Sequence, residues 1–250
     1  MADPVLQIDG LTKRFGGLLA SDGIDIELCH GEIHALIGPN GAGKTTLLAQ
    51  LTGELAPNSG RIRFDGQDIT RLPVHARSRL GVARTFQITS ILPNFTAEDN
   101  VALAVQAHAG HSFRFWAPAR KATALRTPAR DALDQVGLLQ RAGITASALS
   151  HGEHRQLEVA MALATKPRVL LMDEPMAGMG PEESAGMVKL LKALKASYAI
   201  LLVEHDMDAV FALADRISVL VYGRIIATGT PDSIRSNPEV RQAYLGDGDA

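Results

Sequence analysis

The glycine-rich stretch GPNGAGKTT at residues 38–46 constrains this chain more than any other feature of its sequence. It follows the apolar run IHALI at residues 33–37 and precedes KTTLLAQLTG, a helical pattern that we expect Gly53 to end. A strand, a glycine loop and a helix in this order form a phosphate-binding loop, because the glycines let backbone N–H groups turn inward around a phosphate chain. A chance match in a chain of this length is on the order of 1%. The sequence therefore predicts a nucleotide site here.

The backbone and side chains of this loop have separate expected roles in holding a nucleoside triphosphate. Lys44 is expected to reach the β- and γ-phosphates, and the Thr45 hydroxyl is placed to bind Mg²⁺. The expected nucleotide contacts within the loop are Asn40, Gly41, Ala42, Gly43, Lys44, Thr45 and Thr46.

Two other apolar runs end in polar residues that suit the same chemistry. VLLMDEP places Asp173 and Glu174 at the end of a buried strand, where Asp173 can hold Mg²⁺ and Glu174 can polarise a water for attack on the γ-phosphate. LLVEHD ends similarly at His205, although a lone histidine is more often structural. Spacing alone leaves Phe15 and Gln87 open between a role in nucleotide binding and ordinary packing.

Composition excludes several other classes of function. Only one cysteine occurs in 250 residues, so neither an intramolecular disulfide nor a multi-cysteine zinc site can form. The formal net charge of −2 and an aromatic content of 4% argue against nucleic acid as a partner. No apolar run approaches the roughly 18 residues of a membrane span. With 46% hydrophobic residues, the chain can bury one large core with a subdomain.

Patterns along the chain predict an α/β fold. GIDIELCHGEIHALIG is expected to form a hairpin around His30-Gly31, and GRIRFDGQDIT a second hairpin around Asp65-Gly66. The strand signal fades between residues 91 and 149, where helical periodicity predicts a helical subdomain. Apolar runs then alternate with helical patterns up to the C-terminal region, which predicts a parallel sheet with helices on its faces.

The stretch LSHGEHRQLEVAMAL, which begins at Leu149, carries the signals of a helix start. Ser150 can cap the first turn, and Glu153 can complete a capping box. A helix start with a serine and a glycine is also well suited to hold a phosphate. The chain therefore has a second candidate phosphate site, far in sequence from the first.

Taken together, these motifs resemble the nucleotide-binding subunit of an ATP-binding cassette (ABC) transporter over nearly the whole chain. GPNGAGKTT is similar to the Walker A motif, VLLMDE to Walker B, RTFQ to the Q-loop, LSHGE to the signature motif and VEHD to the switch region. The resemblance implies an ATPase that converts ATP and water to ADP and phosphate. It implies catalytic roles for Lys44, Glu174 and His205, adenine stacking by Phe15, and Mg²⁺ binding by Thr45, Gln87 and Asp173, with Gln87 also contacting the nucleotide.

The resemblance also implies a domain organisation. We expect a single nucleotide-binding domain over residues 1–250, with a P-loop NTPase (ABC ATPase) core that contains a parallel sheet and an antiparallel β subdomain. This core is expected to consist of residues 1–90 and 156–250. An inserted helical subdomain with the signature motif is expected over residues 91–155.

Partners follow from the same resemblance. ABC ATPases dimerise head to tail, which implies that Ser150, Gly152 and Glu153 contact an ATP held by a second ABC ATPase subunit, identical or paralogous. Integral membrane permease subunits and, indirectly, a solute-binding protein are the other implied partners, with a cytoplasmic location on the inner face of the cell membrane. ARTFQ and VRQAYLG are similar to the ATPases of branched-chain amino acid importers. Urea or amide importer ATPases and soluble ABC ATPases outside transport are the alternatives.

Three departures from the family pattern and one local feature are not explained by the motifs. In the signature motif, His151 stands where glycine is commonest and Glu153 where glutamine is usual. Many relatives also have an acidic residue near Gly180, and its loss here suggests pairing with a non-identical ATPase. The segment 113–130 mixes aromatic and basic residues, as either an ordinary solvated face or a surface for anionic lipid or the permease. Its basic residues are Arg114, Arg120, Lys121, Arg126 and Arg130.

Overall fold

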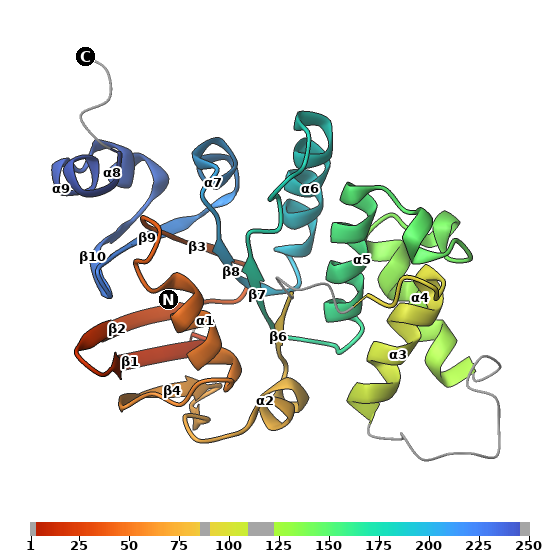
Figure 1. Cartoon of the computed structure of the whole chain (residues 1–250), viewed down its shortest axis with the longest axis horizontal. Coiled ribbons are helices and arrows are strands. Elements are labelled where there is room, and N and C mark those ends of the chain that lie inside the picture. Colours follow the sequence, from red (N-terminus) through yellow and green to blue (C-terminus); the bar gives the residue numbers. More distant parts are fainter. Residues whose placement is uncertain (1–3, 86–90, 110–122, 246–250) are drawn as a thin grey trace.

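The computed structural model describes residues 4–85, 91–109 and 123–245, in which two β-sheets lie on either side of helix α1 (Lys44–Thr52) (Figure 1). A group of helices extends from one end of this core, to the right in Figure 1. The α/β fold with a parallel sheet, an antiparallel sheet and a helical part is the architecture that the sequence predicts.

The smaller sheet is antiparallel and has the strand order β2-β1-β4-β5. Its turn at Asp65-Gly66 pairs Phe64 with Gln67, and both turn residues have positive φ angles, as a two-residue hairpin requires. The predicted hairpin at this place is therefore confirmed. The strands are β1 (Leu6–Phe15), β2 (Leu18–Leu28), β4 (Ser59–Phe64) and β5 (Gln67–Asp68).

The larger sheet has the strand order β10-β9-β3-β8-β7-β6 and is parallel except at β10, which runs antiparallel to β9. Every residue of β3, β7 and β8 is buried, as expected of strands covered on both faces. The strands are β3 (Ile33–Ile37), β6 (Val82–Arg84), β7 (Val169–Asp173), β8 (Ala199–Val203), β9 (Arg216–Val221) and β10 (Arg224–Gly229).

The prediction of a hairpin around His30-Gly31 is wrong. Strand β2 belongs to the smaller sheet and β3 to the larger one, so the chain crosses between sheets at this turn. Strand β3 pairs instead with β8 and β9, whose residues come more than 160 positions later. A local turn signal does not determine whether a strand pairs with its neighbour in sequence or with a distant strand. Strand β3 is buried on both faces, which favours its position inside the larger sheet.

Helix α1 is packed between the two sheets and is fixed at its C-terminal end. Leu47, Leu48 and Leu51 are fully buried in the cluster that both sheets share. Gly53 ends the helix with φ 86°, and its N–H donates to the Gln50 carbonyl, as predicted. Helix α2 (Val74–Leu80) supplies the buried Arg77, whose guanidinium donates to the carbonyls of Gln50 and Leu51 at 2.7 and 2.8 Å.

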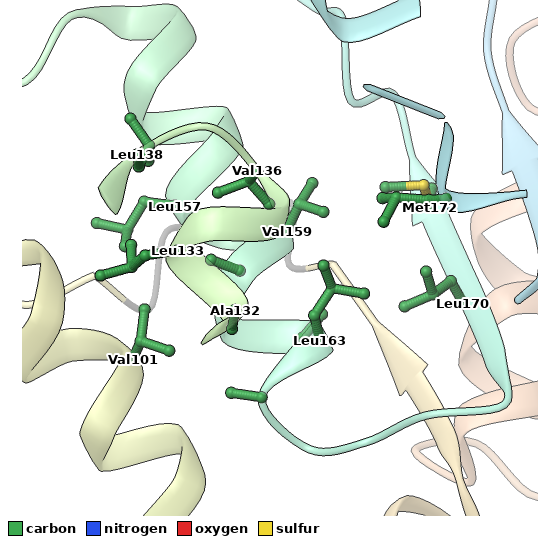
Figure 2. Packing of buried hydrophobic residues seen from close by; sticks show 14 of the residues in the cluster. Val101, Ala132, Leu133, Val136, Leu138, Leu157, Val159, Leu163, Leu170 and Met172 are labelled. Carbon is green, nitrogen blue, oxygen red and sulfur yellow. The ribbon is translucent and has the colours of Figure 1, made fainter. Parts of the chain in front are cut away.

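The helical part is continuous with the core through helix α5 (His151–Leu163) (Figure 2). On one side Leu157 packs with Val101 and Leu133 of the neighbouring helices, and on the other Val159 and Leu163 face Leu170 of β7. The domain boundary expected between residues 155 and 156 falls inside this unbroken helix. The other helices here are α3 (Ala97–Ala109) and α4 (Thr123–Gln135), and short 3₁₀ turns span Leu139–Arg141 and Ala146–Ala148.

The remaining helices cover the larger sheet. They are α6 (Pro181–Leu194), α7 (Met207–Leu213), α8 (Pro231–Ser236) and α9 (Pro238–Val240), followed by a π-helical turn at Arg241–Leu245. Buried residues of α7, α8 and α9 pack with β3 and β9 in a separate cluster. Among the described residues, no helix has the length and apolar character that crossing a bilayer demands.

Candidate nucleotide site

The glycine loop between β3 and α1 leaves the start of α1 open to a ligand. Gly43 is the N-cap residue and has φ 110°, where a Cβ would lie 2.3 Å from the Ala20 carbonyl oxygen, so only glycine fits. Within the described part of the chain, no side chain caps this helix. The first-turn N–H groups and the positive end of the helix dipole are therefore available to an anion.

Lys44 lies at the centre of the loop. Its Nζ donates to the carbonyl oxygens of Gly38 at 2.6 Å and Pro39 at 3.1 Å. Burial lowers the pKa of Lys44, whereas the charges of Glu174 and Asp173 act in the opposite direction. Phosphate oxygens could replace the two carbonyls as acceptors, because the lysine side chain is already held inside the loop.

The ends of β7 and β8 bring the other expected catalytic residues to this loop. Asp173 ends β7 and pairs in register with Val203, the last residue of β8. Glu174 turns away from the strand with φ 49°, and its Oε1 lies 3.7 Å from Nδ1 of His205. Both Glu174 and His205 are accessible to solvent, whereas the side chain of Asp173 is only 2% exposed. The sheet thus gathers residues that are distant in sequence.

Phe15 and two residues of the loop region, Asn40 and Thr45, are expected nucleotide contacts that are exposed to solvent. Phe15 ends β1 with 48% of its surface exposed, and Nζ of Lys13 lies 5.2 Å from the centre of its ring. An exposed aromatic face of this kind is able to stack on a base. Asn40 and Thr45 are exposed on the loop and on the first turn of α1. Gln87 lies outside the described residues.

The second phosphate-site candidate, at the start of α5, is occupied by side chains of the same protein. Ser150 and Glu153 form the predicted capping box. In addition, Oε1 of Glu183, on α6, accepts the Gly152 N–H at 3.1 Å and lies 3.5 Å from the Ser150 hydroxyl. A Cβ at Gly152 would lie 2.7 Å from that carboxylate oxygen. This helix start already holds an anionic oxygen.

Further contacts fix the start of α5 to its neighbours. The Ser150 N–H and Arg141 lower the pKa of Glu153, and Arg141 Nε lies 2.9 Å from its Oε1. Nε2 of His151 lies 3.1 Å from the Ala177 carbonyl oxygen, so this residue, which departs from the signature pattern, contacts the loop between β7 and α6.

The two candidate phosphate sites lie in different parts of the molecule. Figure 1 shows α5 separated from α1 by the strands of the larger sheet.

Three polar residues near the site were not singled out by the sequence motifs. Arg84 pairs with Asp173, Glu183 reaches the start of α5, and the buried Glu204 accepts the N–H groups of Met176 and His205 at 2.9 and 3.1 Å. Burial raises the pKa of Glu204. Only Glu204 had a usable signal, since an acidic residue directly after a fully apolar strand is unusual and needs a partner.

The basic and aromatic segment is only partly described. Arg126 pairs with Glu98 and Asp99 of α3, and Arg130 pairs with Glu98. These two basic side chains therefore bridge α4 to α3, as an ordinary helical face would. Phe113, Arg114, Phe115, Trp116, Arg120 and Lys121 lie outside the described residues.

Comparisons with known proteins complete this picture. The family model "ABC transporter" matches residues 21–177, which is more than half of the chain. The chain belongs to the ABC transporter family. It is thus an ATPase subunit of the ABC type, with a fold that binds nucleotide. A second model, "Branched-chain amino acid ATP-binding cassette transporter", matches residues 224–250.

Relatives of this ABC ATPase cover its full length. The high-affinity branched-chain amino acid transport ATP-binding protein BraF of Pseudomonas aeruginosa is 41% identical, and the match spans 99% of this chain and 100% of BraF. The protein LivG of Escherichia coli K12, which has the same description, is 40% identical with the same coverage.

Solved structures agree with the fold. A nucleotide-free ATP-binding cassette from an ABC transporter is similar with a TM-score of 0.87 and 29% identity, covering 98% of this chain and 100% of that one. Another ATP-binding cassette in its ADP conformation is similar with a TM-score of 0.87, 30% identity and the same coverage. The expected ABC ATPase core is therefore confirmed.

Proposed function

We propose that this ABC ATPase powers a membrane importer for branched-chain amino acids by binding and hydrolysing ATP. The convergence of Lys44, at the start of α1, with Asp173, Glu174 and His205, which end or follow parallel strands, carries the enzymatic part of the proposal. The importer and its solute rest on the full-length likeness to BraF and LivG and on the C-terminal family match. A permease, rather than this subunit, would contact the solute.

The donor groups near the loop fit Mg²⁺ with ATP. No group of three or more His, Cys, Asp or Glu residues suited to a metal occurs among the described residues. Mg²⁺ does not need one, because it commonly takes one or two protein oxygens together with substrate phosphates and water. Thr45 and Asp173 offer oxygens of this kind, and Gln87 would add a third. When bound, Mg²⁺ neutralises charge on the β- and γ-phosphates.

The reaction then needs a positioned water and stabilised charge. Glu174 is the proposed general base that orients the water, and His205 would hold the γ-phosphate nearby. The Lys44 ammonium and the first-turn N–H groups of α1 would stabilise the negative charge of the transition state. Phe15 would stack on the adenine.

The second half of the site would come from a partner. Ser150, Gly152 and Glu153 start a helix that can bind an anion, and a carboxylate oxygen already accepts the Gly152 N–H. We expect this helix start to contact the γ-phosphate of an ATP held by a second ABC ATPase subunit, identical or paralogous. Glu183 would have to withdraw when that phosphate arrives.

A groove of about 580 Å³ is the proposed contact with the permease. It lies between α2 and β6 on one side and α3 and α5 on the other, and its wall is mostly apolar, with Val74, Val82, Ala104 and Met161 among its residues. A cytoplasmic segment of the permease would dock here, next to the strand that leads to Gln87. The subunit would then lie on the inner face of the membrane, and a solute-binding protein would act through the permease.

The catalytic assignment is tested with Glu174→Gln. This variant should bind ATP, hydrolyse it at no more than about 1% of the normal rate, and accumulate as a dimer in sizing experiments with Mg-ATP, alone or with its companion ATPase. Rapid turnover would overturn the role of Glu174.

The solute is tested by reconstitution with the permease and solute-binding protein. ATPase activity should rise with leucine, isoleucine or valine, and a rise with urea alone would favour the alternative importer.

A further inference from the structure

Arg84 lies at the end of β6, beside the proposed metal site, with only 11% of its side chain exposed. Its two terminal nitrogens bind different carboxylates. Nη2 lies 2.8 Å from Oδ2 of Asp173, and Nη1 lies 3.1 Å from Oε2 of Glu54. None of the roles assigned so far uses this guanidinium.

The pair with Asp173 fixes one oxygen of a nearly buried carboxylate. Among the described residues, Oδ1 of Asp173 makes no hydrogen bond to a side chain, whereas Oδ2 is held by Arg84. A carboxylate held in this way cannot rotate freely about its last bond, so its other oxygen keeps one direction. Such outer partners are known to orient metal-ligating groups and to affect metal affinity strongly.

Glu54 gives Arg84 a second anchor. This residue follows Gly53, directly after the end of α1, and its side chain is 42% exposed. Arg84 therefore connects the end of β7 to the end of the helix that begins at the nucleotide loop. Because the planar guanidinium presents two donors at fixed spacing, lysine cannot hold both carboxylates in the same way.

We propose that Arg84 is a positioning residue that orients Asp173 for Mg²⁺ bound with the nucleotide. This inference rests on the proposed metal role of Asp173. Two roles of Arg84 can be distinguished by experiment. If Arg84 orients Asp173, its loss should change the nucleotide affinity that depends on the metal. A purely structural pair would change stability alone.

The test measures the affinity for a fluorescent ATP analogue in Mg²⁺ and in EDTA, in the Glu174→Gln background. The ratio of the two affinities isolates the contribution of the metal. Arg84→Met should lower this ratio about 10-fold, with little change in EDTA. Arg84→Lys should restore part of it, and Glu54→Gln should have a smaller effect than Arg84→Met.

Three controls make each outcome informative. Asp173→Asn should lower the ratio as Arg84→Met does. Arg63→Met removes an Arg–Asp contact of similar length, 2.9 Å, at a more exposed place in the smaller sheet and should leave the ratio unchanged. Circular dichroism reports folding, and Arg84→Lys carries the test if Arg84→Met does not fold.

A normal ratio in Arg84→Met and Arg84→Lys, with a lowered ratio in Asp173→Asn, would overturn the role of Arg84 alone. An unchanged ratio in Asp173→Asn would instead refute the metal role of Asp173, and with it this part of the proposed function.

Discussion

Helices α1 and α5 both begin at a glycine-containing phosphate-site candidate, yet their first turns are arranged in opposite ways. Gly43 caps α1 without a side chain, and its first turn carries no acidic residue. Helix α5 has a complete capping box of Ser150 and Glu153, and Glu183 adds a second carboxylate from α6. One helix start is open to a ligand, whereas the other is satisfied by its own chain.

This difference fits the two proposed tasks. The loop before α1 would receive a nucleotide directly from solution, so open N–H groups are useful there. The start of α5 would receive a phosphate only when a second subunit arrives, and until then its first-turn N–H groups need acceptors. In this proposal the Glu183 carboxylate would satisfy these groups in the free subunit and would compete with the incoming phosphate.

The largest effect should come from the open site. Lys44→Ala removes the buried ammonium and should reduce ATPase activity by at least about 10²-fold, the scale for loss of one transition-state donor. Steady-state hydrolysis assays at saturating ATP check this. Lys192→Ala, at an exposed position on α6, is the control and should keep normal activity. Near-normal turnover in Lys44→Ala would mean that the two helix starts do not differ as proposed.

A smaller effect should come from removing the internal carboxylate at α5. Glu183→Gln keeps the shape of the side chain and its capping contact, but removes the charge that opposes the partner's phosphate. In the Glu174→Gln background, half-maximal dimerisation should need about 3-fold less ATP, as expected for one partly screened charge. Sedimentation velocity at a series of ATP concentrations measures this.

The matched control is Glu182→Gln, which removes the same charge from the exposed neighbouring position on α6. If both variants dimerise alike, Glu183 does not compete with the phosphate and the contrast between the helix starts has no functional consequence.

The smallest effect should be on the pH dependence of folding stability, through Glu153 at the start of α5. The folded pKa of Glu153 is lowered, first by the Ser150 N–H and then by Arg141. Its contribution to stability is therefore full above the unfolded value of about 4.3 and is lost as pH falls through the lower folded value. Solvent still screens this partly exposed carboxylate, so its contribution should stay below about 1 kcal/mol.

Chemical denaturation of the normal chain and Glu153→Gln from pH 7 to pH 3 measures this term. The difference in unfolding free energy should shrink at the acid end. A constant difference would show that the charge of Glu153 does not stabilise the start of α5. Helix α1 has no acidic residue in its first turn and should have no matching term.

Local patterns were sufficient for much of this fold. The loop at residues 38–46, the capping box at Ser150 and the helix end at Gly53 each depend on contacts within a few residues, and each occurs as predicted. Buried apolar strands also predicted the parallel sheet, because apolar residues on both faces require cover on both faces.

Long-range pairings were beyond such patterns. Nothing near His30 indicates that the next strand joins a different sheet, since that choice depends on strands far along the chain. Arg84 and Asp173 are 89 residues apart, and Gly152 and Glu183 are 31 apart. Polar contacts of this kind depend on the arrangement of whole elements, which a single sequence does not reveal.

The buried Arg77 has a mechanical consequence for signalling. Its guanidinium ties the carbonyls at the C-terminal end of α1 to α2, and burial lowers its pKa only to about 10, so it stays charged at neutral pH. Sliding of α1 relative to α2 would break these two bonds and leave the buried Arg77 only its contacts with the carbonyls of Leu72 and Thr70. We therefore expect α1 and α2 to move together, as one unit, when a nucleotide arrives at the other end of α1.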